Sequence, residues 1–581
     1  MAIHQAVLNV VELCVRKGVT NAVISPGSRS APLTLALARH PKMHCRVVAD
    51  ERSAGFIALG LAQQTRKPVI VVCTSGSAVY NLAPAVAEAY FQEIPLLVLT
   101  ADRPKEWIHQ QDGQTIFQSG IFGQHVKQGF EFPSDFTHPD ATWFSERIGN
   151  EALNLTLIPP FGPVHINIPL REPLYPTSEE TFRFGPARII DRLPAEPGLP
   201  PEVWHRLQEE WESAERKLIA VGQGPYDPAL LEILEKISGE WRIPVLGDII
   251  SNLGQNGEFI SQHDLFLSTT GGSLPERLQP DLLVTIGKSF LSKSFKLFLR
   301  KYRPRRHWHI QPHDRLADPF QSLTTQIPHH PVSFFQKLFS DIDFQHFVGN
   351  EEEVWEAGYQ EAWQSADRLA QRTLNQFLVP EDQFHEWAAV RRVLDALPEG
   401  SQLHLANSMP VRYANFCGLE TRRNIEVFAN RGTSGIDGCL STAVGAALAT
   451  DKIVTVLIGD VAFFYDRNAL WNNLIPKNLR IVLLNNHGGN IFRIIDGPAG
   501  QPELDVFFET SQPLSAENTA RDARIRYRRV SDFPSLKAAL GEFYPEGEGP
   551  ALLEIETDRR ENAARFRDYK SLIRKAFPAD D

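Results

Sequence analysis

Residues 454–492, VTVLIGDVAFFYDRNALWNNLIPKNLRIVLLNNHGGNIF, decide how this chain is expected to fold. The stretch opens on an apolar, β-branched run, typical of a buried strand, that stops at Gly459-Asp460. A helix-like segment then leads to a second apolar run that ends at Asn485-Asn486. Two parallel strands joined by such a crossover bring their carboxyl ends to one edge of a sheet, where open α/β sheets bind ligands. We therefore expect Asp460 and Asn486 to face one pocket.

The residue types at this edge suit a hard divalent cation. One carboxylate, one amide oxygen and a backbone carbonyl from the turn His487-Gly488-Gly489 make an oxygen-only shell with too little charge for a structural metal. That shell suits Mg²⁺ when phosphate oxygens complete it. Ordinary loop chemistry is the alternative, because Asp at a strand end and Asn-Asn turns are common. A second, distant feature is needed to decide.

Size and composition describe a protein of several globular domains. A chain of 581 residues holds about three or four domains, and 43% hydrophobic with 22% charged residues is typical of globular proteins. A net charge of −11 and a pI near 5.9 argue against a nucleic-acid partner. The five cysteines lack CxxC spacing and indicate buried thiols in a reducing compartment. With no signal-peptide pattern and no run of about 18 apolar residues, we expect a cytoplasmic protein without membrane insertion.

The first part of the chain repeats strand-like and helix-like segments, which predicts a parallel sheet with crossover helices. Glu51 follows the second of these strands and precedes a small, apolar helix expected over residues 53–62. A partly desolvated carboxylate in that place suits proton transfer, although an acid at a helix start is also favoured by the helix dipole. The expected strands are 21–25, 45–49, 69–73 and 96–100, and their polar loops should line one crevice.

Two further α/β units follow a proline-rich linker at residues 171–201. Strands are expected at 217–221, 244–247, 281–287 and 307–311 in the second unit, and at 402–406 and 425–429 before the opening stretch in the third. The loop Gly222-Gln223-Gly224-Pro225 is a poor dinucleotide fingerprint and is interpreted as structural. Lys288, Lys293 and Lys296 form a basic cluster or a solvated helix face. A charged helix around residues 351–376 should join the two units, and a terminal helix over 559–575 should dock on the core.

A glycine-rich turn, residues 430–438, precedes a helix of small residues expected over 441–449. Such a turn allows a phosphate to approach a helix N-terminus. Tight packing of the helix on the sheet is the alternative. The sequence is compatible with both interpretations.

Together these features resemble thiamine diphosphate enzymes. The fold class is then α/β, with three doubly wound parallel-sheet domains: a pyrimidine-binding domain with a catalytic Glu (1–180), a central Rossmann-like domain (200–345) and a diphosphate- and metal-binding domain (380–581). Finer motifs resemble those of the 2-succinyl-5-enolpyruvyl-6-hydroxy-3-cyclohexene-1-carboxylate synthase family over nearly the whole chain. These motifs are SPGSRSAPLTLAL, DERSAGFIALGLA, TSGSAVYNL, TADRP, NSMPVR, NRGTSGIDG and NNHGGNIF.

The resemblance implies a transferase of menaquinone biosynthesis. It would decarboxylate 2-oxoglutarate and add the resulting succinyl semialdehyde carbanion to isochorismate, with thiamine diphosphate and Mg²⁺ or Mn²⁺ as cofactors. The family builds each site between subunits, which implies a homodimer or homotetramer.

The resemblance also assigns roles to individual residues. Glu51 would be catalytic and would act on the aminopyrimidine ring of the cofactor. Cofactor-binding positions are Glu51, Ser75, Gly76, Ile436, Gly459, Asp460, Asn486 and Ile491, and metal ligands are Asp460, Asn486 and the Gly488 carbonyl. Substrate-binding positions are Ser28, Arg29, Arg103, Gln114, Lys293, Ser408, Arg412, Arg431 and Phe492.

Three alternatives compete with this interpretation. An acetolactate-synthase-like ligase or a simple 2-oxo acid decarboxylase would share the cofactor, but a pyruvate site needs fewer than five basic positions. A dinucleotide-dependent oxidoreductase would need a GxGxxG motif followed by a ribose-binding acid, and this sequence has no credible example of that pattern. A non-catalytic relative would not need Glu51, Asp460 and Asn486 together.

Overall fold

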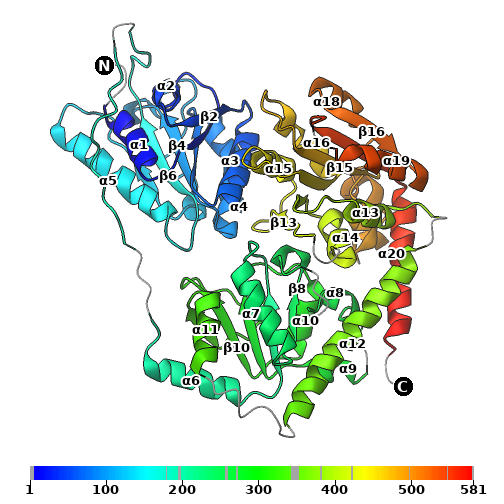
Figure 1. Cartoon of the computed structure of the whole chain (residues 1–581). Coiled ribbons are helices and arrows are strands. Elements are labelled where there is room, and N and C mark those ends of the chain that lie inside the picture. Colours follow the sequence, from blue (N-terminus) through cyan, green and yellow to red (C-terminus); the bar gives the residue numbers. More distant parts are fainter. Residues whose placement is uncertain are drawn as a thin grey trace.

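Three open sheets, all parallel, form the framework of the protein in this computed structural model (Figure 1). The predicted fold class, α/β with three parallel-sheet units, is confirmed. The structure describes residues 5–177, 180–193, 198–254, 259–269, 272–341, 352–379, 383–419, 423–495, 497–545 and 547–578. No helix among these residues is long and apolar enough to cross a membrane.

The first sheet has six strands in the order β2-β1-β3-β4-β6-β5. Its two central strands, β3 and β4, are completely buried, as in parallel sheets covered by helices on both faces. The four predicted strands are present, whereas β5 and β6 were not predicted. The elements are α1 (Gln5–Arg16), β1 (Asn21–Ile24), α2 (Ala31–Arg39), β2 (His44–Val47), α3 (Glu51–Thr65), β3 (Val69–Cys73), α4 (Ser77–Gln92), β4 (Leu96–Asp102), η1 (Lys105–Trp107), η2 (Gly123–His125), β5 (Gly129–Glu131), α5 (Pro139–Thr156) and β6 (Val164–Pro169).

The second sheet has five strands in the order β11-β10-β9-β7-β8. The four predicted strands form it together with the edge strand β11. The elements are α6 (Pro201–Glu212), β7 (Lys217–Val221), α7 (Pro228–Gly239), β8 (Val245–Gly247), η3 (Ile249–Ser251), α8 (His263–Phe266), α9 (Leu274–Leu278), β9 (Leu282–Ile286), α10 (Lys293–Lys301), β10 (Arg306–Gln311), β11 (Thr325–Pro328) and α11 (Pro331–Asp341).

The third sheet, in the order β13-β12-β14-β15-β17-β16, contains the predicted pair of neighbours. β14 and β15 pair in parallel from Val454↔Leu479 to Gly459↔Leu484, so their carboxyl ends do meet at one edge. The elements are α13 (Glu386–Asp395), β12 (Gln402–Leu405), α14 (Met409–Cys417), β13 (Glu426–Ala429), α15 (Cys439–Ala447), β14 (Val454–Gly459), α16 (Asp460–Tyr465), η5 (Arg467–Leu470), β15 (Leu479–Asn485), α17 (Ile491–Ile494), η6 (Pro498–Gly500), the π-helix η7 (Leu504–Phe508), α18 (Glu517–Asp522), β16 (Arg526–Val530), α19 (Phe533–Phe543), β17 (Ala551–Glu556) and α20 (Arg559–Ala576).

Helix α12 (Glu352–Leu378) connects the second and third units and runs beside α20 (Figure 1). Trp363 of α12 is completely buried against Phe266 and Phe298 of the second unit. Tyr569 and Ile573 of α20 are buried in the same cluster, so the terminal helix docks on the core as expected. One apolar core therefore continues across both units.

The first and third units meet where α3 crosses α15, near the centre of Figure 1. Glycines make the crossing possible. A Cβ on Gly60 would lie 2.0 Å from the Thr442 carbonyl oxygen, and one on Gly445 would lie 2.0 Å from that of Ile57. The helix backbones are thus in direct contact, which fixes these two units relative to each other.

Part of the predicted linker belongs to the first unit. Residues 180–193 form no helix or strand but pack along α1 and α5, with Phe184 and Ala187 against the core. Asn150 accepts the backbone N–H of Ile190 (2.7 Å), and Gln5 donates to the Arg183 carbonyl (3.0 Å). The prolines indicate a segment without helix or strand, which residues 180–193 are. The apolar side chains of this segment nevertheless anchor it to the first unit.

Candidate active site

Asp460 lies at the carboxyl end of β14, as the sequence predicted. Its side chain is 2% exposed and accepts hydrogen bonds from the backbone N–H of Val461 (2.7 Å) and of Gly488 (2.8 Å), and from the Gln512 amide (3.0 Å). Burial raises the pKa of Asp460 to about 6, and the hydrogen bonds oppose this rise. A cation beside Asp460 would favour its ionised form.

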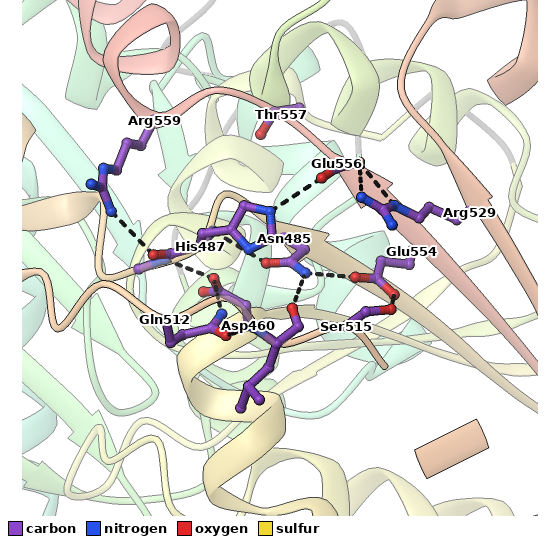
Figure 2. Close-up of polar contacts among 12 residues, drawn as sticks. Asp460, Asn485, His487, Gln512, Ser515, Arg529, Glu554, Glu556, Thr557 and Arg559 are labelled. Carbon is purple, nitrogen blue, oxygen red and sulfur yellow. Dashed lines mark hydrogen bonds and ion pairs between the residues drawn. The ribbon is translucent and has the colours of Figure 1, made fainter. Parts of the chain in front are cut away.

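The two consecutive asparagines after β15 have different surroundings. Asn485 is fully engaged: its amide donates to Glu554 (2.5 Å), and its oxygen accepts the backbone N–H of His487 (3.1 Å) (Figure 2). Asn486 donates its amide to Glu386 (2.8 Å), but its buried Oδ1 has no hydrogen-bond partner among the residues that the structure describes. Asn485 is therefore structural, and Asn486 has an oxygen available for a ligand.

These residues fit a divalent cation bound through oxygen. A buried carbonyl oxygen without a partner costs about 1–3 kcal/mol, so the Asn486 Oδ1 atom indicates a ligand. The turn at Gly488 packs closely against the backbone of Glu509. A Cβ on Gly488 would lie 2.9 Å from the Glu509 carbonyl oxygen, so the absence of a side chain allows the turn to bring the Gly488 carbonyl to the same site. Within the described ranges no three His, Cys, Asp or Glu residues form a metal-binding group. The donor set here, with a single carboxylate, is a different kind of site and suits Mg²⁺ or Mn²⁺ with phosphate.

Glu51 is the first residue of α3 and is partly buried. The preceding Asp50 caps the helix by accepting the Ser53 N–H (3.1 Å), and its other oxygen accepts the Asn468 amide of η5 (2.7 Å). Burial, and next the charge of Glu51, raise the pKa of the Cys73 thiol at the end of β3. Glu51 therefore lies by the loop that follows β3, on the edge where the predicted crevice was expected.

Ser75 and Gly76 form that loop after β3. Ser75 is buried, and no described residue forms a hydrogen bond with its hydroxyl. Gly76 has φ +85 and donates its N–H to the buried side chain of Gln118 (2.9 Å). Gln118 in turn donates to Asn167 on β6 (3.0 Å), so a buried polar network sets the position of the loop. A Cβ on Gly76 would lie 3.2 Å from the Cα of Gln114.

The first unit brings two of the predicted substrate arginines together. Arg29 is buried, donates to the Leu170 carbonyl (3.0 Å) and pairs with Glu172 (3.5 Å). Burial, and next the positive charge of Arg103, lower the pKa of Arg29, so the two guanidinium groups lie within electrostatic reach of each other. Arg103 pairs with Asp112 (2.9 Å). The exposed Ser28 and Gln114 lie in the same loops.

A second basic group lies in the third unit. Arg412 donates to the carbonyl of Ser408 (2.5 Å), a residue whose φ of +75 is sparsely populated and often found at functional sites. Arg431 donates to Asn407 (2.8 Å). Burial lowers the pKa of both arginines, and for Arg412 the charge of Arg431 lowers it further. These two guanidinium groups therefore also lie within electrostatic reach of each other.

The central unit contributes a lysine to this second group. Lys296 is half-buried, and burial lowers its pKa. The negative charge of Asp248 opposes this shift, and the positive charge of Arg431 adds to it. Lys296 thus lies within electrostatic reach of Arg431. Lys293, the lysine predicted from the family motif, is exposed at the start of α10. The family resemblance selected Lys293, whereas in this structure Lys296 is the lysine whose pKa responds to the charge of Arg431.

The predicted apolar positions lie in one loop and in the short helix α17. Ile436 is partly buried against the cluster that includes Phe56 and Ala462. Ile491 packs on the core of the third unit. Phe492 is partly buried, with its ring 5.9 Å from that of Phe508.

The glycine-rich turn at residues 430–438 serves tight packing rather than a phosphate site at the start of α15. The N–H and hydroxyl of Ser441 both bind the buried carboxylate of Asp466 (2.7 Å each). A Cβ on Gly438 would lie 2.1 Å from the Phe56 ring. The first turn of α15 is therefore capped by protein, and the packing alternative is the one that these contacts support.

Comparison with known proteins agrees with this geometry. Residues 6–125 match the family of the thiamine pyrophosphate enzyme N-terminal TPP binding domain. The chain is 44% identical to the 2-succinyl-5-enolpyruvyl-6-hydroxy-3-cyclohexene-1-carboxylate synthase of Cytophaga hutchinsonii, covering 99% of this chain and 100% of that protein. Synthases of the same name from Flavobacterium johnsoniae (38% identical, 97% of each chain) and Desulfotalea psychrophila (36% identical, 96% of this chain and 99% of that protein) are also similar.

Three parallel-sheet units, a strand-end Glu in the first and an Asp-Asn oxygen site in the third define a thiamine diphosphate-dependent enzyme. Identity at this level over the full length is more specific than the cofactor class. The chain belongs to the 2-succinyl-5-enolpyruvyl-6-hydroxy-3-cyclohexene-1-carboxylate synthase family.

Proposed function

We propose that this protein decarboxylates 2-oxoglutarate and joins the remaining succinyl semialdehyde unit to isochorismate, forming 2-succinyl-5-enolpyruvyl-6-hydroxy-3-cyclohexene-1-carboxylate for menaquinone biosynthesis. Thiamine diphosphate supplies the electron sink for this chemistry when bound. The observation that carries the proposal is the unpartnered, buried Oδ1 of Asn486 beside Asp460 in a chain that also keeps Glu51 at the start of α3. A non-catalytic relative would have no use for that costly arrangement.

Each residue has a role that its place supports. Asp460, Asn486 and the Gly488 carbonyl hold Mg²⁺ or Mn²⁺, which neutralises the diphosphate. Glu51 holds and moves a proton at the aminopyrimidine ring. Ile436, Ser75, Gly76, Gly459 and Ile491 would complete the set of residues that hold the cofactor.

The basic residues match the charge of the substrates. Both 2-oxoglutarate and isochorismate carry two carboxylates, and arginine binds a carboxylate through two parallel hydrogen bonds. Two pairs of neighbouring arginines, Arg29 with Arg103 and Arg412 with Arg431, provide that recognition. Ser28, Gln114, Lys293, Ser408 and Phe492 complete the proposed substrate-binding set.

We further propose a cytoplasmic homodimer or homotetramer in which each site lies between subunits. Residues 1–180 would act as the pyrimidine-binding domain, 200–345 as the central domain and 380–581 as the diphosphate- and metal-binding domain. One sheet lies within each range, which supports this division. The two arginine pairs lie on different domains, which supports a shared site.

The reaction is tested by following carbon dioxide release from 2-oxoglutarate with thiamine diphosphate and Mg²⁺, with and without isochorismate, and the product mass. We expect release coupled to an adduct of both substrates. Consumption of pyruvate instead would keep the cofactor and contradict the substrate assignment.

Glu51→Gln tests the proton-transfer role. We expect turnover to fall by about 100-fold or more, because positioned acid–base groups typically contribute factors of this size. Binding of thiamine diphosphate should persist. Glu276→Gln, at an exposed residue of α9, is the control and should be fully active. Unchanged turnover in Glu51→Gln would contradict the proposed role of this carboxylate in proton transfer.

A further inference from the structure

Glu386 has a direct contact with the residue that offers its oxygen to the metal. One Glu386 oxygen accepts the amide hydrogen of Asn486 at 2.8 Å, across a separation of 100 residues in the chain. Both side chains are buried. The only side-chain group of Asn486 that can donate to a carboxylate is its NH₂. The contact therefore turns the NH₂ towards Glu386 and Oδ1 away from it.

The start of the helix that carries Glu386 is held by hydrogen bonds to its backbone. Glu386 is the first residue of α13, is 1% exposed, and donates its backbone N–H to Asn562 (2.9 Å). Asn562 donates to Thr557 (2.9 Å), so the end of β17 and the start of α20 fix this helix terminus. A carboxylate on such a support can define the orientation of a neighbouring side chain.

The orientation of Asn486 matters because an amide has two nearly isosteric ends. Rotation by half a turn exchanges the oxygen, a metal ligand, for an NH₂ that repels a cation. In Asn485 both ends are engaged by protein, so a half-turn would break contacts at both ends. In Asn486 the oxygen has no protein partner. Among the hydrogen-bond partners that the structure describes for the Asn486 amide, only Glu386 distinguishes the two orientations.

We propose that Glu386 is a positioning residue for the divalent cation: it holds the Asn486 amide so that Oδ1 faces the metal position before the metal binds. The inference rests on the proposed metal site and names a residue that the family motifs did not single out. Residues that orient metal ligands in this way typically contribute 10–100-fold to metal affinity.

The test measures Mn²⁺ binding to the full chain with thiamine diphosphate present, from the loss of the electron paramagnetic resonance signal of free Mn²⁺. Glu386→Leu removes the acceptor and should weaken Mn²⁺ binding about 10-fold or more. Glu386→Gln keeps an oxygen that can accept from Asn486 and should bind Mn²⁺ within about 2-fold of wild type. That rescue separates orientation of the amide from a need for negative charge.

Two further variants protect the test from a folding failure. Glu386→Asp retains the acid but withdraws the oxygen from Asn486, so it should weaken Mn²⁺ binding as Glu386→Leu does. Asp395→Asn, at the far end of the same helix, should bind Mn²⁺ as wild type does. Thermal unfolding identifies the variants that are folded. Wild-type affinity in a folded Glu386→Leu or Glu386→Asp variant overturns the proposal, as does weak binding in Glu386→Gln.

Asn486→Leu tells apart failure of this inference and failure of the metal site. If Asn486→Leu binds Mn²⁺ weakly while Glu386→Leu binds normally, the site stands and the role of Glu386 is wrong. If Asn486→Leu itself binds Mn²⁺ normally, the metal site is wrong.

Discussion

Neighbouring residues of the same type can differ in function because of what lies against them. Asn485 and Asn486 each donate to a buried glutamate, but only Asn485 also has a protein donor for its oxygen. The chain thereby assigns one asparagine to hold the turn and leaves the oxygen of the other for a ligand. The donor and acceptor count of each side chain, rather than its residue type, decides this division.

His404 provides a residue-scale prediction about acid stability. The ring is buried on β12 and stacks on Phe428 (4.9 Å between centroids), and its Nε2 has no hydrogen-bond partner in the described part of the chain. Burial lowers the pKa of His404 from 6.5 to about 3. Between these values the unfolded chain binds a proton that the folded chain does not, so the stabilisation present above pH 6.5 is lost as the pH falls.

We therefore expect His404→Phe to reduce the acid sensitivity of the protein. At about pH 5 the neutral ring accounts for about 2 kcal/mol of lost stability relative to pH 7.5, which the variant should recover. Urea unfolding of both proteins at the two pH values measures this difference. His165, whose pKa burial lowers to about 3, stays in both and preserves part of the slope. An equal loss in the two proteins would contradict the assignment.

Site residues were predictable where a local motif carries them and unpredictable where only tertiary contact does. Asp460, Asn486 and Glu51 stand at strand ends, and the strands are recognisable from apolar runs, so their place on the sheet edge followed from the sequence. Glu386 lies in a segment far along the chain from Asn486 and has no motif of its own. Lys296 could not be preferred over Lys293 either, because the choice depends on how α10 meets Arg431 across two domains.

At the level of elements, small residues let α3 and α15 cross with their backbones in contact. The sequence predicted both helices, but not that they would pack on each other. Long buried strands such as β3, β4, β14 and β15 were predicted because apolar runs mark them. The short strand β5 has no buried residue, and the edge strand β16 has one. Neither strand therefore carries such an apolar run.

This crossing predicts the effect of one added methyl group. In Gly445→Ala the new Cβ would lie 2.0 Å from the Ile57 carbonyl oxygen, a backbone atom that cannot move aside alone. We expect a loss of about 1–3 kcal/mol in the free energy of unfolding. Gly541→Ala, on an open face of α19, is the matched control; it should be neutral or stabilise by about 0.5–1 kcal/mol. Equal stability of the two variants would show that the helices can separate without penalty.

At the scale of the whole molecule, the three units meet around one buried carboxylate. Glu88 of α4 accepts the N–H groups of Gly432 and Thr433 (2.7 Å each), next to Arg431. Gln223, from the loop interpreted as structural, donates to the Ala429 carbonyl (2.8 Å). The first and central units thus hold the loop of the third unit that carries Arg431 and Ile436. Within one chain, contacts from two other units therefore position the loop that carries these proposed binding residues.

Part of each site is predicted to come from a second subunit, which a complementation experiment can test. Glu51→Gln and Asp460→Asn should each inactivate the enzyme alone. In a mixed dimer, a shared site pairs the intact Glu51 of one subunit with the intact Asp460 of the other. Statistical mixing of the two variants then restores about a quarter of the sites.

The control and the contrary result follow from the same arithmetic. The control mixes wild type with a chain that carries both substitutions. In each mixed dimer, every shared site then contains one substituted residue, so only the wild-type dimers should be active. If each site lies within one chain, every site in the mixture of single variants has one lesion, and activity stays at the level of the inactive parents. Recovery after co-expression, measured as carbon dioxide release from 2-oxoglutarate, therefore decides whether Glu51 and Asp460 act across the subunit boundary.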